Sequence, residues 1–204
     1  MTRRKCFFEF AIIILSVALF VCVASAREDI SELKKKAELG DAEAQYQLGR
    51  WYDSRFTISC WPFTTNDNLQ EAVKWWFKAA KQGHVRAQYE LGHSYSLGLG
   101  VKKDQLEAAK WYHKAAETGF APAQSALGSM YSMGEGVPLD EVEAVKWWLK
   151  AAEQGVHPAC YRLGKAYAEG LGVSQNREEA IKWLRKADIY PPAKKELAKI
   201  LAAE

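Results

Sequence analysis

A Leu-Gly pair recurs along the chain at a nearly fixed interval, and this repeat limits the possible folds more than any other feature of the sequence. The spacings are 43, 36 and 36 residues, between Leu48-Gly49, Leu91-Gly92, Leu127-Gly128 and Leu163-Gly164. A tyrosine follows each pair at the same distance, at Tyr52, Tyr95, Tyr131 and Tyr167. Self-similarity at a period of about 20 to 50 residues is typical of arrays in which each copy packs only against its neighbours.

Each copy is predicted to form two helices separated by a glycine turn. In the second copy Ala87, Leu91 and Tyr95 lie four residues apart and form one apolar stripe. The glycines of Gly98-Leu99-Gly100 then break the chain. A second helix is expected after Asp104, whose side chain can accept the free N–H groups of the first turn. The equivalent caps in the other copies are Asn68, Asp140 and Asn176.

The glycine of each Leu-Gly pair falls inside the predicted first helix. A glycine there costs about 1 kcal/mol relative to alanine. Its recurrence predicts that a neighbouring helix packs where no side chain fits. A tryptophan recurs at one place in the second helix and is interpreted as core, at Trp75, Trp111, Trp147 and Trp183.

The chain closely resembles the Sel1-like repeat (SLR) family, relatives of the tetratricopeptide repeats, in the pattern Ala87…Leu91-Gly92…Tyr95…Gly98-x-Gly100…Asp104…Ala108…Trp111…Ala115-Ala116…Gly119. The resemblance implies an all-α fold, a right-handed α/α superhelical solenoid of four helix-turn-helix repeats. The repeats are expected at about 41–84, 85–120, 121–156 and 157–190. Flanking half-repeats, Leu33–Gly40 and a terminal helix at 192–203, are expected to cover the apolar ends of the stack.

The first copy carries a loop insertion, which lengthens its spacing from 36 to 43 residues. The loop, Asp53–Asp67, contains Trp61 and Phe63, and such apolar content is unusual for a surface connection. One interpretation is a lid over the N-terminal end of the solenoid. The other is a partner-binding knob, because rigid aromatic side chains are common anchors of interfaces.

The N-terminus has the three-part layout of a secretory signal peptide, expected over residues 1–26. A basic stub precedes the apolar run Phe10–Val23, and Ala24-Ser25-Ala26 forms a small-x-small cleavage site. We expect a mature chain of residues 27–204, periplasmic or secreted, with no stable membrane insertion. The alternatives are an uncleaved membrane anchor, a lipoprotein signal ending at Cys22, and a eukaryotic secretory chain.

Composition and motifs disfavour several function classes. The net charge is +3, of which the first 26 residues supply +2, so the body lacks the basic surface that nucleic acid requires. Neither Cys-x-x-Cys nor two histidines at ligand spacing is present, and we expect no metal or other cofactor. Without a P-loop or a Gly-x-Ser-x-Gly elbow, we expect no enzyme and no catalytic residues. His84 and His157 are expected to be solvated residues of the inter-repeat turns.

Cys60 and Cys160 are the cysteines that follow the expected signal peptide. They lie three repeats apart in the expected solenoid, which implies a separation of about 30 Å. A disulfide needs Cα atoms within about 7 Å, so we expect free thiols or an intermolecular bond.

One face of the first helices varies from copy to copy, unlike the core positions. Its three rows are Gln47, Glu90, Ala126 and Arg162; Arg50, His93, Ser129 and Lys165; and Ser54, Leu97, Met133 and Glu169. Together with the loop, this face supplies the candidate partner-binding residues Arg50, His93, Leu97, Met133, Lys165, Trp61 and Phe63. We expect an exported non-enzymatic scaffold for a protein or peptide partner, with a regulatory, envelope-assembly or host-interaction role. The resemblance leaves a cell-wall or β-lactam-acting enzyme as the alternative.

Overall fold

The computed structural model describes residues 30–53 and 68–202, and all regular secondary structure in these ranges is helical. A helix over residues 30–38 comes first. The others are α2 (Ala42–Tyr52), α3 (Leu69–Lys81), α4 (Val85–Leu97), α5 (Gln105–Glu117), α6 (Ala121–Met133), α7 (Glu141–Glu153), α8 (His157–Glu169), α9 (Arg177–Lys186) and α10 (Pro191–Ala202). The all-α fold predicted from the sequence is confirmed.

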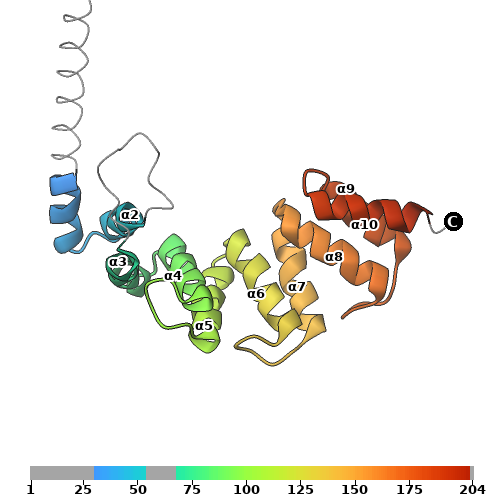
Figure 1. The fold of residues 1–204 in the computed structure, drawn as a ribbon, viewed down its shortest axis with the longest axis horizontal. Coiled ribbons are helices and arrows are strands. Elements are labelled where there is room, and N and C mark those ends of the chain that lie inside the picture. Colours follow the sequence, from blue (N-terminus) through green and yellow to red (C-terminus); the bar gives the residue numbers. More distant parts are fainter. Residues whose placement is uncertain (1–29, 54–67, 203–204) are drawn as a thin grey trace, which may run out of the picture.

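The helices stack in chain order along a curved path, from α2 to α10 (Figure 1). Each packs mainly against the helices before and after it in the sequence. The last helix, α10, contacts both α9 and α8 and buries Ala193 completely. This tandem arrangement is the solenoid that the repeat predicted, with α10 covering its C-terminal end.

The predicted caps form at the start of each second helix. The side-chain oxygen of Asp104 accepts the backbone N–H of Glu107 at 3.0 Å, and Asp140 accepts that of Glu143 at 2.9 Å. The asparagine caps are equivalent, at Asn68 and Asn176. These bonds satisfy N–H groups that have no partner within the helix.

The glycine of each Leu-Gly pair packs against a side chain of the following helix, as predicted. A Cβ built on Gly49 would stand 2.4 Å from Trp76 Cδ1, and one on Gly92 would stand 2.6 Å from Tyr112 Cδ1. The same contact recurs at Gly128 with Trp148 and at Gly164 with Leu184. The repeated tryptophans are also core residues, between 5% and 8% exposed, at Trp75, Trp111, Trp147 and Trp183.

The turns between paired helices touch the preceding repeat through their second glycine. Gly136 has φ +71°, and a Cβ built there would lie 2.0 Å from the carbonyl oxygen of Gln105. Gly100 and Gly172 meet Leu69 and Glu141 in the same way. No other residue type combines this backbone conformation with so close an approach to a carbonyl.

Buried glutamine side chains link the second helix of one repeat to the first helix of the next. Gln124 Nε2 donates to the carbonyl of Ala116 at 3.2 Å, and its Oε1 accepts from Gln154 at 2.8 Å. Equivalent bonds to main-chain carbonyls come from Gln45 and Gln88, while the thiol of Cys160 stands 3.7 Å from the carbonyl of Ala152. This recurring glutamine contact was not predicted from the sequence.

The expectation that His84 is a solvated turn residue is wrong. Its side chain is only 14% exposed, and the ring stacks on Tyr46 with centroids 4.6 Å apart. Nδ1 accepts the backbone N–H of Ala87 and so caps α4, while Nε2 lies 2.9 Å from Glu43 Oε2. The turn folds back on α2, so the histidine becomes part of the packing between repeats.

Candidate functional site

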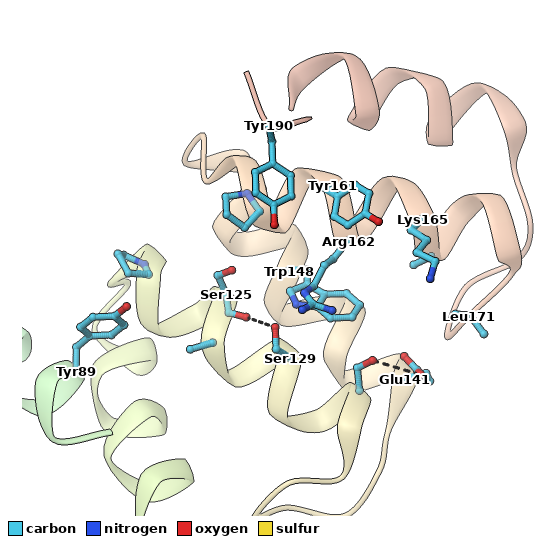
Figure 2. A pocket seen from close by; sticks show the side chains of 15 residues that line it. Tyr89, Ser125, Ser129, Glu141, Trp148, Tyr161, Arg162, Lys165, Leu171 and Tyr190 are labelled. Carbon is cyan, nitrogen blue, oxygen red and sulfur yellow. Dashed lines mark hydrogen bonds between the residues drawn. The ribbon is translucent and has the colours of Figure 1, made fainter. Parts of the chain in front are cut away.

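A groove of about 520 Å³ crosses the face formed by the first helices of three successive repeats (Figure 2). Its residues come from α4, α6 and α8, with further contributions from α7 and from the segment before α10. It lies on the face where the sequence varies from copy to copy.

The groove forms because α6 carries smaller side chains than the other first helices at the positions that face it. Two residues after the first alanine of the stripe, the other repeats have Tyr46, Tyr89 and Tyr161, and α6 has Ser125. The next variable positions on α6 hold Ala126 and Ser129, where neighbouring repeats hold charged, amide or imidazole side chains. The third repeat therefore forms a low floor between two higher walls.

The walls are aromatic and are held by ring contacts. Tyr89 on α4 packs against Phe120 with ring centroids 5.5 Å apart. On the other side Tyr161 packs against Tyr190, also at 5.5 Å. Each tyrosine is thereby positioned before any ligand binds, which lowers the entropic cost of binding.

Two serine hydroxyls of the groove are already engaged. Ser129 Oγ donates to the carbonyl of Ser125 at 3.1 Å, and Ser132 Oγ donates to Glu141 Oε1 at 3.4 Å (Figure 2). Neither of these two serines is hydrogen-bonded to a histidine or lysine, the usual base beside a nucleophilic serine.

Two cations line the groove, and their surroundings differ. Lys165 is 46% exposed and lies 3.5 Å from Glu169 on the next turn of α8. The guanidinium of Arg162 lies 5.7 Å from the ring centroid of Trp148. Within residues 30–53 and 68–202 no carboxylate is within ion-pair distance of Arg162. Its charge is therefore available to a ligand.

The sequence-predicted candidates fall in different places. Lys165 lines the groove. Leu97 and Met133, 58% and 50% exposed, end α4 and α6 outside the lining, and Arg50 and His93 do not line it either. Trp61 and Phe63 lie outside the described residues.

The residues that shape the groove were not among the candidates predicted from the sequence. Arg162 and Ser129 belonged to the variable face and were not chosen, and Ser125, Tyr161 and Trp148 were not considered. The sequence did hold one sign of the groove, because Ser125 stands where the other three repeats have a tyrosine.

The described part of the chain has neither a metal-binding cluster nor a membrane-spanning helix. No group of three or more His, Cys, Asp or Glu residues there could hold a metal ion. None of the described helices is both long and apolar enough to cross a bilayer. Cys160 is a buried free thiol, and burial raises its pKa.

Comparisons of the sequence and of the structure with known proteins point to the same family. The Sel1 repeat family model matches residues 42–84, 85–120, 121–156 and 157–187. The chain is similar to c5321, a protective antigen present in uropathogenic Escherichia coli strains displaying an SLR fold, with 43% identity over 78% of this chain and a TM-score of 0.71. It is also similar to a Sel1 repeat protein from Oxalobacter formigenes, with 34% identity over 84% of this chain and a TM-score of 0.72.

The similarity covers only part of these relatives, 32% of the E. coli protein and 66% of the O. formigenes protein. No curated protein matches the sequence. The four family-model matches nevertheless fall on the four helix pairs α2–α3, α4–α5, α6–α7 and α8–α9. The chain belongs to the Sel1 repeat family.

Proposed function

We propose that this protein is an exported, non-enzymatic scaffold that binds a protein or peptide partner in the groove between α4, α6 and α8. Sel1 repeat proteins generally act as protein–protein interaction scaffolds. The observation that carries the proposal is the preformed groove, in which one repeat lacks the large side chains that its neighbours carry on this face. Core packing alone does not require small residues at the groove positions of α6.

Export to the periplasm or the medium is supported by the signal-peptide layout of residues 1–26. The relative c5321 is a protective antigen present in uropathogenic E. coli strains. A host-interaction role for this chain is consistent with that description, beside the regulatory and envelope-assembly roles. Retention through an uncleaved signal is the alternative location.

The alternative of a cell-wall or β-lactam-acting enzyme receives no support from the groove. The hydroxyls of Ser129 and Ser132 donate to a main-chain carbonyl and to a carboxylate, and neither donates to a histidine or lysine. For the scaffold function, we propose that the partner surface extends beyond the groove to Leu97 and Met133, two exposed apolar side chains at the ends of α4 and α6. Arg50 and His93 belong to the same face on the earlier repeats.

Site-specific crosslinking tests the proposed function. A photo-reactive phenylalanine analogue at Ser129, on the groove floor, should crosslink a discrete partner when the protein is expressed in the organism that encodes it. The matched control carries the analogue at Lys146, an exposed residue of α7 that does not line the groove. Equal crosslinking from both positions, or none from Ser129, would contradict the proposed function.

A further inference from the structure

We infer, on the basis of the proposed function, that the groove recognises an extended segment carrying an aromatic side chain close to an aspartate or glutamate. The aromatic ring occupies the space above Ser125, and the carboxylate pairs with Arg162. Two independent observations lead to this chemistry, one from packing and one from charge.

The packing observation is a missing aromatic pair. In the other three repeats, the tyrosine in the position of Ser125 contacts a ring beside the start of a later helix. These pairs are Tyr46 with His84, Tyr89 with Phe120, and Tyr161 with Tyr190. In the third repeat the two positions hold Ser125 and Val156, so both rings are absent.

The space above Ser125 is bounded by aromatic and proline surfaces. Tyr89, Pro122, Pro158 and Tyr161 line it, with Trp148 from α7 below (Figure 2). A ring from a partner would contact the same kinds of surface that tyrosine contacts in the neighbouring repeats. Aromatic pairs in such arrangements contribute binding energy beyond the area they bury.

The charge observation is the position of Arg162. Its guanidinium lies over Trp148, at the wall of the same space, and no carboxylate of the described residues neutralises it. The groove's own carboxylate, Glu141, instead accepts a hydrogen bond from Ser132. Lys165 is already paired with Glu169, so among the charged residues that line the groove Arg162 is the one that favours an acidic ligand. Arginine binds carboxylates in a bidentate geometry that a neutral ligand cannot satisfy.

The two ligand groups are expected to lie close together along the bound segment. Ser125 lies on α6 and Arg162 on α8, and both residues line the same groove. The two helices both pack against α7, which carries Trp148 between them. Because an extended chain advances about 3.3 Å per residue, a segment that crosses from α6 to α8 should present its acidic residue about one to three positions from the aromatic residue.

Selection from a random heptapeptide phage library, panned on the purified protein, tests this inference. We expect enriched peptides to contain Phe, Tyr or Trp with Asp or Glu one to three positions away. Enrichment of neutral or basic peptides, or no enrichment over a blank surface, would overturn it. Synthetic copies of the enriched peptides are then measured by fluorescence anisotropy.

Two variants separate the packing and charge components. Ser125→Tyr installs the residue of the other repeats, so it should fold normally, keep the melting temperature and reduce peptide affinity by about 30-fold or more. Arg162→Gln should weaken binding about tenfold, and should have little effect on the same peptide with Glu changed to Gln. Lys146→Gln is the matched control, because it removes an exposed positive charge outside the groove and should leave affinity unchanged.

The outcomes also separate this inference from the proposed function. If Ser125→Tyr blocks binding and Arg162→Gln does not, the acidic specificity is wrong while the groove remains the binding site. If Ser125→Tyr leaves binding unchanged, the peptides bind elsewhere, and the crosslink through Ser129 alone decides whether the groove is a partner site.

Discussion

The indole ring of Trp148 lies directly against Gly128, so that a Cβ built on the glycine would stand 2.6 Å from the ring's Cδ1 and 3.0 Å from the carbonyl oxygen of Ala144. The contact joins α6 to α7 within the third repeat. It also places Trp148 below the groove, since the ring can lie there only because the glycine has no side chain. One glycine thus contributes both to stability and to the shape of the site.

Gly128→Leu is expected to destabilise the protein by about 1–3 kcal/mol, because the added side chain forces α6 and α7 apart. Urea denaturation measures the loss. The matched control is Ser129→Leu, the same enlargement one residue later on the groove side of α6, which should cost less. Equal stability of the Gly128 variant and the natural protein would contradict the close-packing interpretation.

Thr118→Gln is expected to stabilise the protein by about 0.5–1.5 kcal/mol. Gln82 and Gln154 each donate to a buried glutamine, but Thr118 stands in their place in the second repeat, and Gln88 Oε1 has no partner among the described residues. A glutamine there supplies the missing donor.

The reverse change, Gln154→Thr, should lower the free energy of unfolding by a similar amount. In a Gln88→Ala background Thr118→Gln should give no gain, because the acceptor is gone. A gain of equal size in that background would show that the hydrogen bond is not the cause.

The contact between Glu43 and His84 is expected to make stability depend on acid pH. Hydrogen bonds from His84 and Gln47 lower the pKa of Glu43, and Arg86 adds to the effect. Because the folded pKa lies below the unfolded value, the contribution is present above the ordinary carboxyl range and is lost as pH falls through the lowered pKa. Glu43 is 63% exposed, so the effect should be small.

Thermal melts of the natural protein and Glu43→Gln at neutral and acid pH check this dependence. The melting temperature of Glu43→Gln should be lower than that of the natural protein at pH 7, and the difference should shrink as pH falls through the lowered pKa of Glu43. A difference that grows as pH falls would contradict the assignment.

The exported protein is expected to begin at Arg27, directly after Ala24-Ser25-Ala26. N-terminal sequencing of the exported protein measures this. An intact Met1 would indicate a membrane anchor, and a lipidated Cys22 would indicate a lipoprotein.

Trp61→Ala and Phe63→Ala are expected to leave the melting temperature nearly unchanged and to reduce the yield of the partner crosslinked through Ser129, because interface anchors bind the partner rather than the solenoid. The melt and the crosslinking yield are measured on the same preparations. A lower melting temperature with a proportionate loss of crosslinking would show that these residues form a lid over the solenoid.

The sequence by itself determined the helices, their caps and their order of packing. The Leu-Gly pairs, the polar caps and the recurring tryptophans act within one repeat or between neighbours, so their spacing along the chain carries the information. Gly128 could be predicted to contact a neighbouring helix for this reason.

Only the tertiary structure decided where the groove lies and which charges it presents. Ser125, Trp148 and Arg162 lie on three different helices, and the hollow between them depends on side-chain volumes that sequence spacing does not report. The partners of His84 and Gln88 were likewise set by the packing of adjacent repeats. Helix patterns follow from local periodicity, whereas a cavity is the space left when side chains from distant positions meet.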